Sequence, residues 1–548
     1  MNPSVAYFSM EIALEASIPT YAGGLGVLAG DTLRAAADLE LPMIAVTLLH
    51  RSGYFTQRIG PEGVQYDEPA RWSPEERLEP LDARLEVHLG DHRVRLRAWR
   101  YGVEGVRGGA VPVYLLDSDV PENGPDCRSI TDRLYGDGPV ARLRQEAVLG
   151  LGGIALLEAI GVEVDVHHLN EGHSALLAVA LLERGEDLEA IRRRCVFTTH
   201  TPVPAGHDRF AEETVREVLG PGRMERLREI GAMVDGSLDM TRLALAVSRR
   251  VNGVSLRHAE VSREMFPGRE MDAITNGVHV ATWVSPPFAE LFDRRLPGWR
   301  EESANLRHAI GIELDEVEAA RGAAKRNLIE VLHARGRPGF SADRFTIGFA
   351  RRATAYKRAD LLFGDLDRLR SIAARHGGLQ VVYGGKAHPR DEEGRAMIRR
   401  VVEAARGIGD DVSVVWLEEY DMALAGILVA GVDLWLNTPR KPLEASGTSG
   451  MKAALNGVPS LSVLDGWWIE GCVDGMTGWA IGDDPRAPSD PAGELESLYR
   501  TLDEEILPTW RDRPEAWAAV SRWSIALNGS WFTARRMLLQ YVQRAYSR

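Results

Sequence analysis

Lys452 stands at the end of a stretch of small residues that suits phosphate chemistry. The stretch, Glu444 to Lys452, reads EASGTSGMK; it follows the strand-like run Val432 to Asn437 and opens the helix-like run Met451 to Asn456. Backbone amides and hydroxyls at a helix start can cradle a phosphate, and a lysine one turn further on can reach the same ligand or an aldehyde cofactor. An N-cap followed by an ordinary surface lysine explains the spacing equally well. The pattern alone leaves both interpretations open.

A second candidate is the basic cluster Arg351 to Arg358, with the sequence RRATAYKR. It lies at the carboxyl end of the strand-like run Phe345 to Arg352, which is the edge where open α/β sheets bind ligands. Arginine grips phosphate with a planar fork and lysine as a point charge. The cluster therefore predicts an anion site, although a solvated charge run is the common alternative.

A third candidate is the glycine-rich turn within Tyr21 to Asp31, sequence YAGGLGVLAGD, which leads into the helix-like run Thr32 to Leu39. Gly23 and Gly24 would let the backbone approach a phosphate or a sugar hydroxyl closely. A tight packing turn is the plain alternative. The turn does not fit a dinucleotide fingerprint, because no clear strand precedes it.

Two histidines follow strand-like runs in the first half. His173 ends the sequence NEGH and His200 lies in THTP. Each lone histidine is more often a hydrogen-bonded packing residue than a catalyst, but a shared position at sheet carboxyl ends favours function. No metal site is expected: His167, His168 and His173 could not share a zinc ion easily, since adjacent side chains on a strand face opposite ways.

The elements that must position these residues alternate between strand and helix in the second half. The helix-like stretch Arg390 to Ile408 is typical, so βαβ units and a mostly parallel, Rossmann-like sheet are predicted. The predicted strands are Phe345 to Arg352, Leu379 to Gly384, Val412 to Leu417, Val432 to Asn437 and Ser460 to Val463.

The first half shows the same pattern around a long predicted helix, Val140 to Ile160, together with an inserted hairpin, Leu85 to Trp99. Its predicted strands are Met43 to Leu49, Val111 to Leu116, Val164 to Leu169 and Val196 to Thr201. We expect two α/β domains, residues 1–275 and 276–548, that face each other across a cleft. Terminal helices within Trp510 to Arg548 are expected to cross back to the first domain.

Composition narrows the function. The 548 residues carry a net charge of −14, which argues against a nucleic-acid partner. The three cysteines, Cys127, Cys195 and Cys472, have neither disulfide nor metal spacing, which favours a reducing cytoplasm. No signal-peptide pattern and no uncharged apolar run of about 18 residues is present, so neither export nor a membrane partner is expected.

Together these motifs resemble the glycogen and starch phosphorylases, an α-glucan phosphorylase family with a two-Rossmann-domain (GT-B) glycosyltransferase fold. The stretch Glu444 to Lys452 matches the family's cofactor segment and is the most specific element of the resemblance, which covers nearly the whole chain. The resemblance implies that pyridoxal 5′-phosphate is bound by residues 276–548 and glucan by residues 1–275. Lys452 would form the Schiff base.

The resemblance also implies roles for individual residues. Its cofactor site would be formed by Gly23, Gly24, Arg351, Lys357, Gly447, Thr448, Ser449 and Lys452. Arg352 and Lys357 would hold substrate phosphate against the cofactor phosphate, and Lys452, Arg352, Lys357, His200 and Glu444 would be the catalytic set. The glucose site would be formed by Leu25, His173, His200, Asn276, Arg352, Glu444, Ser446 and Gly447.

The implied reaction uses the cofactor through its phosphate. Inorganic phosphate would cleave α-1,4-linked glucose from the non-reducing end of glycogen, starch or maltodextrin, giving α-glucose 1-phosphate with retention. Cations and helix-start amides would offset the repulsion between two phosphates. The family favours a homodimer. The start near Ala6 to Glu11 leaves no counterpart of the animal enzymes' regulatory segment, so we expect no AMP control.

Two other functions share these features. A nucleotide-sugar glucan synthase of the same fold would also place basic residues and a glutamate after the late strands, but it would need no pyridoxal lysine. A non-catalytic α-glucan-binding protein could keep the fold. The presence of Lys452, Arg352, Lys357, His200 and Glu444 argues against loss of activity.

Overall fold

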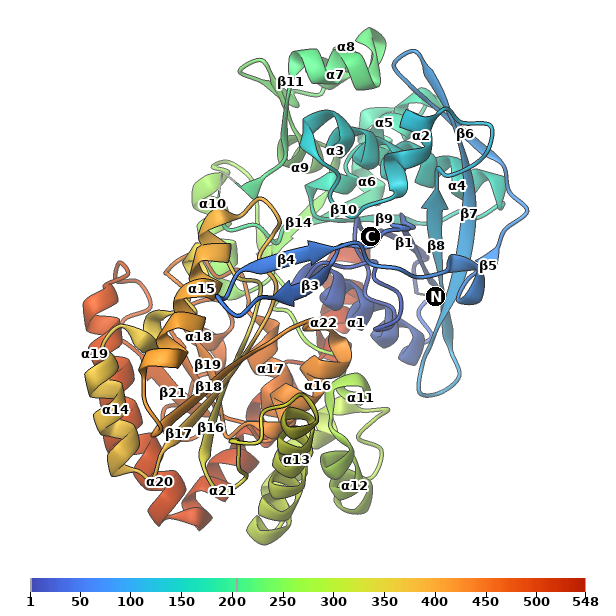
Figure 1. Ribbon diagram of the computed structural model, residues 1–548. Coiled ribbons are helices and arrows are strands. Elements are labelled where there is room, and N and C mark those ends of the chain that lie inside the picture. The colour runs from blue at the N-terminus through green and yellow to red at the C-terminus, as the bar shows by residue number, and fades with distance from the viewer. Residues whose placement is uncertain (1, 204–205, 548) are drawn as a thin grey trace. The chain divides into compact units, whose positions relative to one another are not determined.

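The chain divides into two α/β units in the computed structural model, which describes residues 2–203 and 206–547 (Figure 1). The first unit contains residues 1–55, 69–275 and 537–548, and the second contains residues 56–68 and 276–536. Thr56–Glu68, which the sequence placed in the first domain, therefore clusters with the second unit. The chain passes between the units four times, so neither unit is one continuous piece of sequence.

The first unit is built on a large, mostly parallel sheet. Its strand order is β15-β14-β10-β9-β1-β2-β8-β7-β5, with β6 paired to β7. The parallel strands are β1 (Val5–Phe8), β2 (Met43–Leu48), β8 (Ala110–Asp117), β9 (Val166–Asn170), β10 (Cys195–Thr198), β14 (Arg250–Gly253) and β15 (Asp272–Ala273). The chain starts in the middle at β1, fills one side with β2 and β8, and then fills the other. The order therefore reverses between β1 and β9, which is a Rossmann-type switch point where ligands commonly bind.

The expected hairpin and long helix of the first unit are both present. The antiparallel strands β6 (Leu85–Leu89) and β7 (His92–Glu104) pair at the edge of the sheet, and β5 (Glu79–Pro80) also pairs with β7 (Figure 1). The helix runs through α3 (Gly138–Ala147) and α4 (Gly153–Ala159), with a π-helical segment, Val148–Gly152, between them. Two glycines allow this helix to pack closely. A Cβ on Gly150 would lie 2.5 Å from the backbone of Leu177, and a Cβ on Gly153 would lie 2.4 Å from the Phe8 ring.

The second unit has a six-stranded parallel sheet in the order β18-β17-β16-β19-β20-β21. The strands are β16 (Phe345–Ala350), β17 (Leu379–Gly384), β18 (Val412–Leu417), β19 (Leu434–Asn437), β20 (Ser460–Val463) and β21 (Gly478–Ile481). This is the same arrangement as in the first unit, with the switch point between β16 and β19. The expected strands are all present, within two residues at each end, while β21 was not predicted.

A short hairpin, β3 (Thr56–Ile59) and β4 (Gln65–Glu68), belongs to the second unit. Buried Gln65 contacts the loop after β17 from both sides: its Nε2 donates to the Ala387 carbonyl at 2.9 Å, and its Oε1 accepts from the Ala387 N–H at 2.9 Å. Gln57 donates to the Gly385 carbonyl at 2.9 Å. Because side-chain amides satisfy backbone groups here, the hairpin is bound to the second unit without a shared sheet.

The last twelve residues return to the first unit. They include the end of α22 (Ala534–Tyr541) and a π-helical turn, Val542–Tyr546. The Tyr546 hydroxyl lies 2.7 Å from Nδ1 of His168, and the Tyr541 hydroxyl lies 3.0 Å from the Thr198 hydroxyl. Both tyrosine rings are buried, so this segment completes the first unit's core.

Candidate active site

The second unit brings a carboxylate and two cations together at its switch point. Nζ of Lys357, in the loop after β16, lies 2.8 and 2.6 Å from the two carboxylate oxygens of Glu444, in the loop after β19. Nη2 of Arg351 lies 2.7 Å from the same carboxylate. All three side chains are at most 10% exposed, so the cluster is nearly closed to solvent and its charges interact strongly.

Burial and neighbouring charges change the proton affinities of this cluster. Burial, with the positive charge of Arg351, lowers the pKa of Lys357 to about 7, although Glu444 pulls it upward. Burial alone would raise the pKa of Glu444, but Arg351 and Lys357 outweigh burial and hold it below its usual value. Glu444 is therefore ionised at neutral pH, and Lys357 titrates near neutrality. Perturbed values of this kind are typical of functional sites.

Lys452 lies in α17 (Thr448–Leu455), which starts at the same edge of the sheet. The N-cap is Gly447, with φ of 92°, a left-handed conformation that favours glycine. A Cβ on Gly447 would lie 3.5 Å from Arg351 Nη2 and 3.6 Å from the Glu444 carboxyl carbon, so the helix start adjoins the charged cluster. Lys452 itself is 7% exposed, and its Nζ lies 3.9 Å from the centroid of the Trp283 ring.

Three buried polar atoms of candidate site residues in the second unit lack a hydrogen-bond partner among the described residues. They are the side-chain oxygens of Asn276 and Ser446 and Nη1 of Arg351. Buried polar groups are normally paired, and unpaired ones call for an explanation such as a ligand. All three belong to the residues that the sequence assigned to sugar, phosphate or cofactor.

Two expected residues have mainly structural contacts. The hydroxyl of Ser449 accepts the indole N–H of Trp435 at 3.1 Å. Arg358, the last residue of the basic cluster, donates to the carbonyls of Thr438 and Pro439 and pairs with buried Glu494 at 2.5 Å. Arg358 therefore ties the loop after β16 to the loop after β19, while Arg352 is exposed.

In the first unit, the glycine-rich turn forms the start of α1 (Gly24–Asp38), and Gly23 is the N-cap. Fully buried Glu11, in the loop after β1, accepts the N–H of Ala22 at 2.6 Å and that of Gly23 at 3.3 Å. A Cβ on Gly24 would meet nothing within 4 Å, so the turn borders open space. Leu25, half-buried, is in the first turn of the same helix.

The two candidate histidines lie at the same edge of the first sheet, His173 in the short 3-10 helix Gly172–Ser174 after β9 and His200 in the loop after β10. Nε2 of His173 accepts the Met10 N–H at 3.1 Å, and burial lowers its pKa to about 3, so it is neutral. Nε2 of His200 lies 2.8 Å from the Asn170 side-chain oxygen, and the backbone N–H of His200 donates to the Glu171 carboxylate at 2.8 Å. Burial lowers the pKa of His200 well below its usual value. Both are neutral hydrogen-bonding groups rather than proton-accepting bases.

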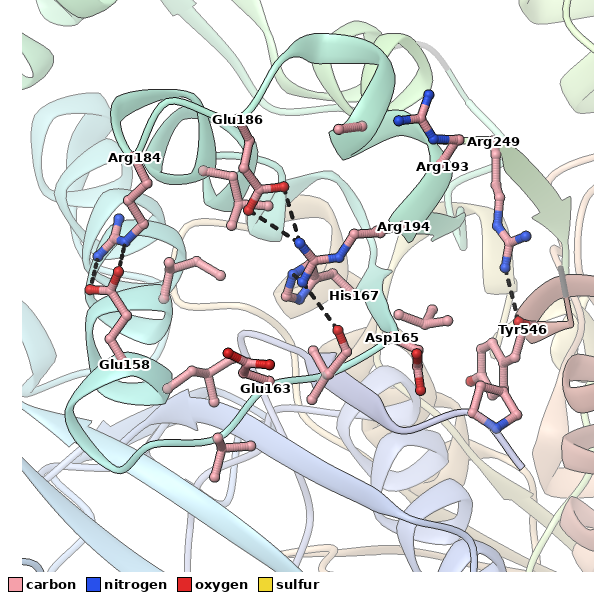
Figure 2. Close-up of a pocket in the computed structure, with 18 of the residues that line it drawn as sticks. Glu158, Glu163, Asp165, His167, Arg184, Glu186, Arg193, Arg194, Arg249 and Tyr546 are labelled. Carbon is pink, nitrogen blue, oxygen red and sulfur yellow. Dashed lines mark hydrogen bonds and ion pairs between the residues drawn. The ribbon is translucent and has the colours of Figure 1, made fainter. Parts of the chain in front are cut away.

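A cavity of about 1270 Å³ lies at the opposite, amino-terminal edge of the first sheet (Figure 2). Its charged side chains largely bind one another or backbone: Arg184 pairs with Glu158, Arg194 with Glu186 at 3.0 Å, and Arg249 donates to the Tyr546 carbonyl at 2.9 Å. Because these charges are already matched and the glycine turn lies at the other edge, we do not place the reaction here.

Sequence reasoning missed three residues that support the site: Glu11 behind the glycine turn, Trp283 beside Lys452, and Asp465, whose carboxylate accepts the Glu444 N–H at 2.9 Å. Asp465 could have been found, because it follows the predicted strand Ser460 to Val463 at the ligand edge, whereas Glu11 follows β1, which the sequence analysis did not predict. Trp283 carries no such signal. Among the described residues no group of three or more histidine, cysteine, aspartate or glutamate side chains could hold a metal ion.

Comparison with known proteins agrees with this geometry. The family model of the carbohydrate phosphorylases matches residues 197–473, and that of the starch synthase catalytic domain matches residues 12–277. The chain is 39% identical to the maltodextrin phosphorylase of Thermococcus litoralis, over 99% of this chain and 70% of the relative. It is 37% identical to the glycogen phosphorylase of Mycobacterium tuberculosis, with the same coverage, and 35% identical to that of Aquifex aeolicus, over 99% and 86%.

Two Rossmann-like units with phosphate-suited loops at their switch points define an α/β enzyme of the glycosyltransferase class. The chain belongs to the carbohydrate phosphorylase family. The fold class, the family and the phosphorylase function predicted from the sequence are confirmed. Within residues 2–203 and 206–547, no helix combines the length and the apolar character needed to cross a membrane.

Proposed function

We propose that this enzyme is an α-1,4-glucan phosphorylase that uses pyridoxal 5′-phosphate and inorganic phosphate to release α-glucose 1-phosphate from non-reducing chain ends, with retention. Relatives that share 35–39% of its residues are named glycogen or maltodextrin phosphorylases, which supports a glucan as substrate. The observation that carries the proposal is the buried group of Lys357, Glu444 and Arg351 beside the helix that contains Lys452.

The residues at the start of α17 fit the cofactor. Lys452 is buried one turn into the helix with an aromatic ring against its Nζ, and Gly447 is the N-cap in a left-handed conformation. Backbone amides at a helix start suit a phosphate group. The side-chain oxygen of Ser446 and Nη1 of Arg351 are buried without partners among the described residues. Lys452 would hold the cofactor, with Gly447, Thr448 and Ser449 around its phosphate. When bound, the cofactor supplies a phosphate group that can exchange a proton with substrate phosphate.

The chain's own residues would bind and orient the substrates. Arg352 and Lys357 would hold inorganic phosphate, with Arg351 next to them, and their charges would stabilise negative charge in a nearly closed site. Asn276, Ser446 and Glu444 would hydrogen-bond the glucose in the second unit. For the first unit we propose Gly23 and Gly24 as phosphate-binding amides and Leu25, His173 and His200 as sugar-binding residues. Phosphate attacks the sugar, so no carboxylate nucleophile is needed.

A nucleotide-sugar glucan synthase is the second candidate, because the starch synthase model matches residues 12–277. The reactions are separated by their donors. A synthase would elongate maltooligosaccharides with ADP-glucose or UDP-glucose and would not respond to phosphate. The phosphorylase would instead consume glucan only when phosphate is present. The non-catalytic alternative predicts neither reaction from an enzyme with cofactor bound.

The decisive experiment is phosphorolysis of a ladder of maltooligosaccharides, with and without phosphate, measured as glucose 1-phosphate. Lys452→Ala is expected to lose both the pyridoxal absorbance band and at least about a thousandfold of kcat, because the covalent anchor is removed. The control is Lys441→Ala, a half-buried lysine whose Nζ donates to the Asp484 carbonyl at 2.7 Å and contacts none of the proposed site residues; it should retain both signals. Full activity in Lys452→Ala would contradict the proposal.

Localisation, assembly and regulation are further parts of the proposal. All three cysteines are unpaired, and Cys127 and Cys195 are buried, which supports a reducing cytoplasmic setting. A homodimer is proposed from the family resemblance, and activity independent of AMP is proposed as a departure from the regulated animal members of that family. Gel filtration with light scattering, and assays with and without AMP, test these two points.

A further inference from the structure

We propose that Asp465 is a positioning residue that holds the backbone at Glu444 so that the Glu444 carboxylate reaches Lys357 and Arg351. The inference rests on the proposed function of this site and assigns a role to the loop after β20, which the sequence motifs did not include. Asp465 is 2% exposed. We assign it no direct role in binding substrate; it acts through Glu444.

The contacts of Asp465 span two neighbouring loops. One carboxylate oxygen accepts the Glu444 N–H at 2.9 Å, and the other accepts the Gly466 N–H at 2.9 Å. The strands β19 and β20, which precede these loops, are paired in parallel. A buried carboxylate bound to two amides is a strong and directional contact, because both hydrogen bonds are charge-assisted. Asp465 therefore fixes the loop after β19 at the residue whose side chain contacts both cations.

The next two residues complete the connection. The Trp467 N–H donates to the Ser446 carbonyl at 2.9 Å. Gly466 has φ of 56°, and a Cβ on it would lie 2.5 Å from that same carbonyl oxygen and 3.1 Å from the Glu444 side chain. The Trp467 side chain is 2% exposed and packs directly against Gly450 of α17, where a Cβ would lie only 2.7 Å from the indole ring. Trp467 thus supports the helix of Lys452 while Asp465 supports Glu444.

The position of Glu444 affects how Lys357 titrates. Burial and Arg351 lower the pKa of Lys357, and the Glu444 carboxylate is the group that raises it. Tyr356, whose ring lies 4.5 Å from Nζ, and Arg352 also face Lys357. If the Glu444 backbone shifts, the carboxylate withdraws, and Lys357 loses its proton at lower pH. A merely structural role for Asp465 would lower stability without this change.

The test is Asp465→Asn, in which an amide NH₂ replaces one acceptor and faces a backbone donor. Phosphate affinity is measured by calorimetry on the holoenzyme from pH 6 to 9, together with kcat/KM for phosphorolysis. We expect the basic limb of both profiles to move down by about one pH unit and kcat/KM at pH 7.5 to fall about tenfold. Asp365→Asn is the control, because Asp365 accepts the Arg368 N–H at 3.0 Å at another helix start of the same unit. Its profiles should match the wild type.

A double-mutant cycle with Glu444→Gln tests whether Asp465 acts through Glu444. The basic limb of both pH profiles should already be shifted in Glu444→Gln, and adding Asp465→Asn should move it no further. Additive shifts, or a lower Tm with an unmoved limb, would overturn the inference. If Asp465→Asn does not fold, Asp465→Ser, which keeps one acceptor oxygen, takes the same measurements. A wild type that binds phosphate but releases no glucose 1-phosphate would refute the proposed function, while the calorimetric cycle would still decide the role of Asp465.

Discussion

Lys357 is the residue whose chemistry depends most on its surroundings. A lysine on the surface would stay charged throughout the neutral range, but this side chain is buried beside Arg351 and kept protonated mainly by Glu444. The sequence indicated a basic cluster at this position. It could not show which basic residue would share a carboxylate 87 positions further along the chain.

The titration of Lys357 predicts how phosphate use depends on pH. With a pKa of about 7, Lys357 is charged below that value and increasingly neutral above it. The KM for phosphate should therefore rise above pH 7, by up to about tenfold per pH unit. Initial rates at fixed glucan from pH 6 to 9 measure this. Lys357→Arg, which stays charged across this range, should remove the limb; an unchanged limb would assign it to another group.

At the scale of elements, three loops that follow β16, β19 and β20 carry the site of the second unit. They are adjacent because the sheet order reverses between β16 and β19. The sequence predicted most strands of this sheet, since each is a compact β-branched run, and hence the edge at which the candidate residues gather. It did not predict the hairpin Thr56–Glu68 as part of this unit. Two four-residue strands give little periodicity, and their contacts at Gly385 and Ala387 are more than 300 residues away in the chain.

The loop after β20 offers a prediction about backbone geometry. Gly466→Ala should lower the free energy of unfolding by about 2–4 kcal/mol, because it combines a left-handed backbone with a close contact to the Ser446 carbonyl. Gly475→Ala is the matched control: its φ is 68°, but a Cβ there meets nothing within 4 Å, so only the conformational term of about 1 kcal/mol applies. Urea unfolding of both variants measures the difference. Equal losses would show that the close approach contributes nothing.

At the scale of the whole molecule, the two units repeat one design with different polar interiors. Six histidines have pKa values lowered by burial, and all belong to the first unit. They are His50, His167, His168, His173, His200 and His258. Their clustering was not predictable from the sequence, which showed histidines at strand ends but not that strands, helices and the returning C-terminal segment would enclose them.

These histidines predict that the first unit is the less stable one in acid. Their folded pKa values are lowered, to about 3–4 where the shift is defined, whereas unfolded histidine titrates near about 6.5. Their contribution to stability is complete above about pH 6.5 and is lost as pH falls, by up to about 1.4 kcal/mol per pH unit for each histidine. Hydrogen exchange at pH 7, 6 and 5 should show the first unit losing protection before the second. Simultaneous loss in both units would contradict this.

The return of residues 537–548 to the first unit has a consequence for biosynthesis. During translation, the central strands of the first unit leave the ribosome long before Tyr541 and Tyr546 are made. Until then, the side chains of His168, Thr198 and Asn252 lack the tyrosine hydroxyls that they hydrogen-bond in the folded protein. All of the second unit except the hairpin Thr56–Glu68 is synthesised in that interval. The first unit is therefore expected to stay incomplete until residues 537–548 have left the ribosome, which makes the N-terminal half a client for chaperones during translation.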